Sequence, residues 1–216
     1  MSGAAAYAPL YLLADSQPLF AGAGGPSILE RASPALSAAP RAAYLGAANG
    51  DEAVFYDLFS AAMDGAGIED RAMVHSRYDE ADRARLAAAD LVVLAGGDVE
   101  RGWRIFMQSG IREALLARYA AGAVLLGVSA GAVHLGWGYL GLVPAHVGAH
   151  EEGDRWDELR RRMRRDGGRV RGLGVAAGGA LVADADGGFE PLRRAAVELV
   201  FGGDGDEIGE SLLLPA

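Results

Sequence analysis

The sequence contains neither cysteine nor lysine, and all 20 of its basic residues are arginine. Without cysteine, the chain can form no disulfide, no thiolate metal site and no cysteine nucleophile. Without lysine, it can form no Schiff base and has no lysine general base. Any covalent catalysis must therefore use another residue.

Long apolar runs and positive charge are also scarce. No apolar stretch reaches the ~20 residues needed to span a bilayer, and residues 1–15 lack the positive segment of a signal peptide. The chain carries 29 acidic residues and a net charge of −9, which disfavours nonspecific binding to nucleic acid and anionic membranes. We therefore expect a cytoplasmic protein with no nucleic-acid or membrane partner.

The 216 residues, 51% of them hydrophobic, suffice to bury most of one core. We expect a single domain over residues 1–216, in which the polar, glycine-rich tail at 202–216 is mobile. Short apolar runs that end in Gly, Ser or Asp predict buried parallel strands at 8–14, 42–47, 90–97 and 123–129.

Helix-like segments separate these runs and continue beyond them. They predict helices at 51–67, 78–89, 100–122 and 154–169. The first would place Val54, Leu58, Ala61 and Ala62 on one face and end near Gly65. Residues 18–43 read as a loop around one short helix, and 179–200 as two strands joined by an Asp/Gly turn. The alternation predicts an α/β fold of three layers, a mostly parallel sheet with helices on both faces and ligands beyond the carboxyl ends of its strands.

The stretch LLGVSAGAVHLG (125–136) has the order of a strand, a sharp turn and a helix. Ser129 would occupy the turn, where the small residues Gly127 and Gly131 permit a strained backbone. The N–H of Ala130 would point from the helix N-terminus toward a developing negative charge. The alternative is an ordinary strand-to-helix turn.

A second glycine pair, in LAGGDVERGW (94–103), also follows a predicted strand and opens a helix. Gly97 could donate a second N–H to an oxyanion if the two strands are neighbours. Asp98 is a substrate-binding candidate, although such a residue more often caps the following helix.

Three stretches together resemble peptidase family S51, which includes dipeptidase E and cyanophycinase: VVLAGGDVERGW (92–103), GVSAGAVHLG (127–136) and GLGVAAGGALVADADGG (172–188). The resemblance implies the fold of class I glutamine amidotransferases and a dimer. It also implies that Ser129 is the nucleophile, that Gly97 and Ala130 form the oxyanion hole, and that small aspartyl peptides are the substrates. Amidotransferase activity is disfavoured because those enzymes use a cysteine.

The general base must be one of four histidines. His75 reads as a surface residue, and His134 lies about 140° around the helix from Ser129, so it points away from the turn. His150 is favoured over His146 because the catalytic histidine of the resembling family occupies a similar place. In that family a phenylalanine follows the histidine, whereas Glu151 follows His150 here.

The acid of the resembling family is missing, because Ala176 and Ala177 stand in the corresponding stretch. Losing the acid of a comparable triad costs about 10⁴-fold in turnover. The replacement candidates are Glu151, Glu152, Asp154, Asp184 and Asp186, of which Glu152 and Asp154 are preferred; a solvated acidic cluster is the alternative.

Arg155 is the best-placed arginine to bind a substrate carboxylate, because it lies closest in sequence to His150. The run at 160–165 reads as a solvated helix face. No spacing matches a metal site or a nucleotide fingerprint, so we expect no metal and no cofactor. Two functions follow: a serine peptidase of small peptides, or a degenerate relative that binds or assembles without cutting.

Overall fold

Seven strands form the central sheet of the computed structural model, which describes residues 7–22, 25–184, 186–202 and 207–215. The strands are β1 (Leu10–Leu13), β2 (Ala42–Leu45), β3 (Arg71–Val74), β4 (Leu91–Leu94), β5 (Val124–Val128), β8 (Ala180–Ala183) and β9 (Phe189–Leu192). Their order is β3-β2-β4-β5-β1-β8-β9. The first five run parallel, whereas β8 and β9 pair antiparallel at one side. The four predicted apolar runs are confirmed as β1, β2, β4 and β5.

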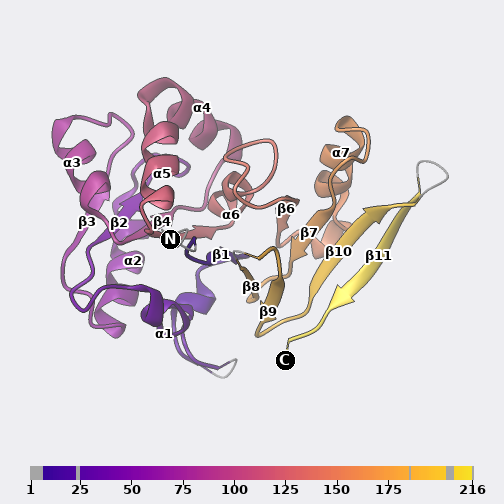
Figure 1. Cartoon of the computed structure of the whole chain (residues 1–216), viewed down its shortest axis with the longest axis horizontal. Coiled ribbons are helices and arrows are strands. Elements are labelled where there is room, and N and C mark those ends of the chain that lie inside the picture. The colour runs from indigo at the N-terminus through magenta and orange to yellow at the C-terminus, as the bar shows by residue number, and fades with distance from the viewer. Residues whose placement is uncertain (1–6, 23–24, 185, 203–206, 216) are drawn as a thin grey trace, which may run out of the picture.

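Helices cover both faces of this sheet (Figure 1). They are α1 (Ile28–Ala32), α2 (Ala53–Gly65), α3 (Glu80–Ala88), α4 (Val99–Ser109), α5 (Ile111–Ala120) and α6 (Ala130–Leu135), with the short 3-10 turns η1 (Gln17–Leu19) and η2 (Ser33–Ala35). A third turn, η3 (Glu152–Asp154), and helix α7 (Asp157–Arg165) come later in the chain. Alternate side chains of β1 enter two separate cores: Leu12 faces the core shared with α3 to α6, and Leu13 the core shared with α1 and α2. This confirms the predicted three-layer α/β fold.

A second, four-stranded sheet lies beside the first and carries α7 (Figure 1). Its strands are β6 (His146–Ala149), β7 (Gly172–Val175), β10 (Ala196–Phe201) and β11 (Ile208–Leu213). Trp156, Leu159 and Met163 pack from the α7 side against Leu199 of this sheet. The two strands predicted at 179–200 are confirmed as β8 and β9, which pair antiparallel, but this range also contains most of β10, which belongs to the second sheet.

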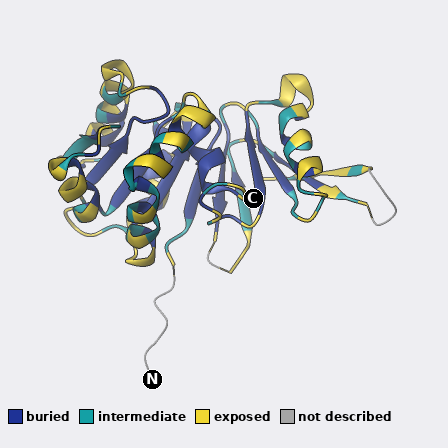
Figure 2. Ribbon diagram, turned by 90° about the horizontal axis from the view of Figure 1, so that it is seen from above, coloured by how far each residue is buried: buried dark blue, intermediate teal, exposed yellow. Residues whose placement is uncertain are grey.

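The prediction of a mobile tail at 202–216 is wrong for Ile208–Leu213, which pairs along its length with β10. Backbone hydrogen bonding to a partner strand, rather than apolar patterning, forms β11, and most of its residues are exposed (Figure 2). Residues 203–206 and 216 of that prediction lie outside the described part of the chain.

Two helix predictions need correction. The helix predicted at 100–122 is divided at Gly110, whose φ of 87° is left-handed, into α4 and α5. In α2, Phe59, Ala62 and Met63 are buried, whereas Leu58 and Val54 are exposed. Apolar residues occur on two stripes of this helix, so spacing alone did not identify the buried one. The predicted end at Gly65 is confirmed. No helix within the described ranges is long and apolar enough to cross a membrane.

Candidate active site

Ser129 stands alone between β5 and α6 in a strained backbone conformation. Its φ of 50° and ψ of −111° lie outside the regions favoured by residues with a side chain. Its N–H donates to the Leu13 carbonyl, 2.9 Å away, which ties the turn to the end of β1. This confirms the predicted strand, sharp turn and helix.

The glycines on either side of the turn are required by close packing. A Cβ on Gly127 would lie 2.4 Å from the backbone of Gly131, and a Cβ on Gly131 would lie 2.2 Å from the carbonyl oxygen of Leu94. Neither glycine has a positive φ. They allow α6 to approach the sheet, and this approach fixes the direction of the Ser129 side chain.

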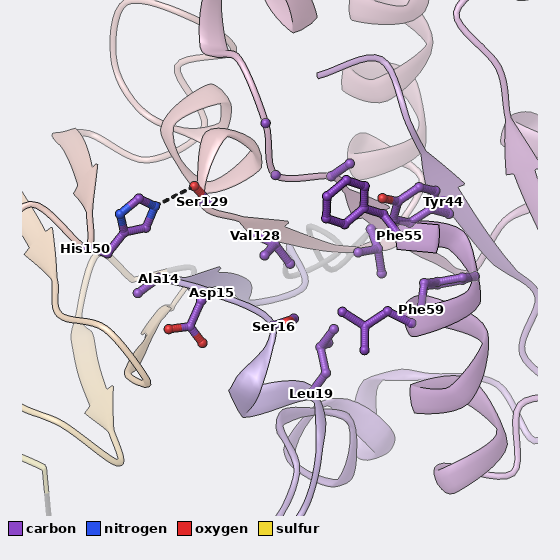
Figure 3. A pocket seen from close by; sticks show the side chains of 15 residues that line it. Ala14, Asp15, Ser16, Leu19, Tyr44, Phe55, Phe59, Val128, Ser129 and His150 are labelled. Carbon is purple, nitrogen blue, oxygen red and sulfur yellow. Dashed lines mark hydrogen bonds between the residues drawn. The ribbon is translucent and has the colours of Figure 1, made fainter. Parts of the chain in front are cut away.

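His150 meets Ser129 from the second sheet. Its Nε2 lies 2.8 Å from Ser129 Oγ (Figure 3). His150 follows β6 directly and has a φ of 47°, while its N–H donates to Val175 at the end of β7. The side chain thus arrives from a strand end, held by backbone bonding to the neighbouring strand.

The other three histidines are engaged elsewhere, as their nearest polar atoms show. His134 is fully buried in α6 with its Nε2 2.8 Å from the carbonyl of Val99, and burial lowers its pKa. His146 contacts Asp166 at 3.1 Å, and burial lowers its pKa as well. His75 is a partly exposed partner of Asp82, at 3.1 Å.

The second glycine turn lies next to the first because β4 and β5 are parallel neighbours. A Cβ on Gly96 would lie 3.3 Å from the Cβ of Ser129. Gly97 has a φ of 138°, and a Cβ there would lie 2.4 Å from the carbonyl oxygen of Ala48. Only glycine fits this position. Asp98 caps α4 by accepting from the Arg101 N–H at 2.7 Å.

Two backbone donors are available at these adjoining turns. Ala130 is the first residue of α6, so its N–H has no partner within the helix. The N–H of Gly97 donates to no residue within the described ranges. Unpaired N–H groups beside a hydroxyl nucleophile are the elements from which an oxyanion hole is built.

The turn after β7, where the resemblance placed an acid, binds two carboxylates through its backbone. The N–H of Ala177 donates to Glu152 at 3.0 Å, and the N–H of Gly178 donates to Asp15 at 2.7 Å. Glu152, the candidate expected to hold the ring of His150, thus bonds instead to a neighbouring backbone group, which offered a donor within its reach.

The remaining acid candidates lie apart from the imidazole. Glu151 accepts from the Leu159 N–H at 3.0 Å and from Arg162 at 3.3 Å. Asp184 and Asp186 belong to the connection between β8 and β9. Across the described ranges no carboxylate, including that of Asp154 in η3, is within hydrogen-bonding distance of His150 Nδ1.

Asp15 is a site residue that the sequence analysis missed. It is half-buried and follows the end of β1, the strand next to β5. The available signal was its position, because polar residues after the carboxyl end of a parallel strand gather at the ligand-binding edge of the sheet.

A cavity of about 250 Å³ opens beside Ser129, and Asp15, Gly97 and His150 line it. Figure 3 shows Ser129 and His150 at one end and Phe55, Phe59 and Leu19 toward the other. Arg155 does not line this cavity, contrary to expectation; it lines a different one, with Trp156, the residue that precedes α7. Arg155 has a left-handed backbone conformation, with a φ of 53°, at the end of η3, where the chain turns toward α7.

Comparisons with known proteins identify a family and two similar folds. The family model of peptidase family S51 matches residues 27–138. Among solved structures, a peptidase from an acI-B1 Actinobacterium is similar over 98% of this chain and 96% of its own, with a TM-score of 0.71 and 16% identity. A candidate peptidase E protein from Listeria monocytogenes EGD-e is similar over 88% of this chain and 100% of its own, with a TM-score of 0.64 and 15% identity.

No curated protein matches the chain in sequence. At 16% and 15% identity, the two structural neighbours show similarity of fold alone. The family model covers more than half of the chain, including both glycine turns and Ser129. The chain belongs to peptidase family S51.

Proposed function

We propose that this protein is a serine-type peptidase of small peptides, in which Ser129 is the nucleophile and His150 the general base. The observation that carries the proposal is the 2.8 Å contact between Ser129 Oγ and His150 Nε2 at a strained turn. A hydroxyl is a poor nucleophile unless a base takes its proton, and this distance suits that transfer.

The reaction follows from the positions of these groups. Ser129 Oγ attacks the peptide carbonyl while His150 Nε2 accepts the hydroxyl proton. The N–H groups of Gly97 and Ala130 stabilise the oxyanion. His150 returns the proton to the leaving amine as the C–N bond breaks, and water then hydrolyses the acyl-serine ester by the same proton path.

We propose that Glu152, rather than Asp154, is the carboxylate that stabilises the imidazolium form of His150. Glu152 is two residues from His150, and the Ala177 N–H fixes its carboxylate beside the strand end that also binds the His150 backbone. A negative charge held near an imidazole stabilises the imidazolium that forms during proton transfer. Glu152 is thus a positioning residue that acts through His150.

The aspartyl preference implied by the resemblance needs a cation beside the nucleophile. Asp15 is the acidic residue and His150 the basic residue among those that line the cavity, and no arginine is among them. We therefore propose the reaction type without carrying over the aspartyl preference.

The alternative is a relative that binds peptides without cutting them. It is favoured by the absence, within the described ranges, of a carboxylate bonded to His150 Nδ1. Hydrolysis of a panel of small peptides by the protein and its Ser129→Ala variant separates the two functions. Cleavage that is lost in a folded Ser129→Ala variant supports the peptidase, whereas equal cleavage by both proteins, or none by either, refutes it.

A further inference from the structure

The cavity beside Ser129 has walls of apolar side chains from several elements. Those contributed by η1, β2, α2, β4 and β5 are Leu19, Tyr44, Phe55, Leu58, Phe59, Val93 and Val128. The one hydroxyl among them, on Tyr44, is buried and accepts from Asn49 Nδ2 at 2.7 Å. Burial raises the pKa of Tyr44 to about 12, so it stays neutral. The deeper part of the cavity therefore offers apolar surface and no charge.

Helix α2 presents large apolar side chains to this cavity, and two of them are not buried in the core between the helix and the sheet. Phe55 and Leu58 remain 44% and 39% exposed, while Phe59, one helical turn after Phe55, is buried against the sheet. Residues three and four apart form one helix face, so these three side chains make a continuous wall. Exposed apolar surface that lines a concave site is surface that a ligand can cover.

The charges at the cavity oppose an acidic substrate. Asp15 lines the same cavity as Ser129, and its carboxylate would repel a second carboxylate. Arg155, the predicted partner for a substrate carboxylate, lines a separate cavity. An aspartyl side chain would thus lose its hydration without gaining a cation, which is unfavourable.

We propose that the cavity beside Ser129 binds a large apolar side chain, such as that of leucine or phenylalanine, on the residue that supplies the scissile carbonyl. Gly97, which lines this cavity, also supplies one N–H of the proposed oxyanion hole. When the carbonyl oxygen of a residue lies in the oxyanion hole, the side chain of that residue branches from the Cα bonded to the carbonyl carbon. It is therefore closer to the cavity than the side chain of the leaving residue, which lies beyond the amide nitrogen. The inference rests on the proposed serine peptidase function and names its substrate class.

The test compares acetyl-aminoacyl p-nitroanilides of leucine, phenylalanine and aspartate with the whole protein. We expect kcat/KM for the leucine and phenylalanine substrates to exceed that for aspartate by about 100-fold. Equal values, or a preference for aspartate, would overturn the inference while leaving the serine mechanism intact.

Two arginine substitutions on α2 sharpen the test. Leu58→Arg places a cation in the cavity wall and should lower kcat/KM for leucine and raise that for aspartate, each about tenfold. Val54→Arg is the matched control, since Val54 is 64% exposed on the same helix and does not line the cavity. If both variants behave alike, the wall formed by α2 does not select the substrate.

A binding measurement keeps the inference testable if no substrate is cleaved. Calorimetry with the Ser129→Ala variant measures affinity for matched leucine and aspartate dipeptides without turnover. Tighter binding of the leucine peptide supports the apolar pocket even if the peptidase proposal fails. Tighter binding of the aspartate peptide, or binding of neither, contradicts the pocket assignment.

Discussion

At the scale of single residues, the site depends on side chains whose direction is set by strand ends. Ser129 follows β5, His150 follows β6 and Asp15 follows β1. Each is held by a backbone or side-chain hydrogen bond to an adjacent segment. Such positions keep reactive groups in place without a large buried polar network.

Glu152 provides a residue-scale prediction. Glu152→Gln should lower kcat about tenfold, less than the loss of a directly bonded acid, because its charge acts on His150 across a gap. KM should stay unchanged, since the side chain does not line the cavity. Steady-state kinetics of this variant beside Asp154→Asn measure both constants. An unchanged kcat, or equal losses in the two variants, would remove Glu152 from the mechanism.

His134 provides a prediction for stability against pH. Its burial lowers the pKa below the ordinary 6.5, so the folded protein holds a neutral ring where the unfolded chain would bind a proton. The stabilising contribution is present above pH 6.5 and is lost as the pH falls toward the folded pKa, by up to about 1.4 kcal/mol per pH unit.

Urea unfolding at pH 7.5 and 5.5 compares the protein with His134→Gln, which can still donate to Val99 but does not titrate. The free energy of unfolding of the unsubstituted protein should fall more steeply toward low pH than that of the variant. Parallel pH curves would show that His134 is not held neutral by burial.

The sequence predicts some of these residues and not others. Ser129 and His150 were recognisable because the nucleophile turn has a short local signature and the histidine follows at a characteristic place. Asp15 was not, because only the pairing of β1 with β5 and β8 brings it to the site. The bonding of Glu152 to Ala177 depends likewise on contacts between distant segments.

At the scale of elements, α6 must approach the sheet closely for Ser129 to point correctly. Gly131→Ala would force a Cβ to 2.2 Å from the backbone carbonyl of Leu94. The free energy of unfolding should fall by about 3 kcal/mol, the upper range for overpacking, and activity should fall with it. Chemical denaturation and kinetics measure the two effects.

Gly65→Ala is the matched control for that substitution. A Cβ on Gly65, at the end of α2, would meet no atom within 4 Å. Alanine is a better helix former than glycine, so stability should be unchanged or rise by up to about 1 kcal/mol. A comparable loss in both variants would mean that the close approach of α6 to the sheet does not explain the effect of Gly131→Ala.

Arg193 holds the loop that forms one side of the cavity. Its guanidinium donates to the carbonyls of Gln17, Phe20, Gly25 and Pro26. Arg193→Ala should lower the free energy of unfolding by about 2 kcal/mol, since charged donors make the stronger hydrogen bonds. KM should rise because Leu19, in that loop, lines the cavity. Arg194→Ala, at the exposed neighbouring position, is the control and should change neither quantity.

Element prediction worked where one segment carried its own signal. Continuous apolar runs identified the buried parallel strands, and Gly65 marked the end of α2. The break at Gly110 and the strand β11 were missed because the first is one residue in a periodic segment and the second is mostly polar. The structure of both segments depends on contacts with residues distant in sequence, which a local sequence pattern does not include.

At the scale of the whole molecule, the site is formed where two sheets meet. The central sheet contributes Ser129 and both glycine turns, while the smaller sheet contributes His150 (Figure 3). The alternating sequence predicted the central sheet with its covering helices. The second sheet was not predicted, because its order, β11-β10-β7-β6, joins strands from separate parts of the chain.

The central claim is that this arrangement makes Ser129 a nucleophile. Labelling with a fluorophosphonate, read by intact mass and peptide mapping, tests it without knowledge of the substrate. The account predicts one adduct per chain on Ser129, no adduct in Ser129→Ala, and labelling slowed about 100-fold or more in His150→Ala. An unlabelled native protein, or equal labelling of the Ser129→Ala variant, would contradict it.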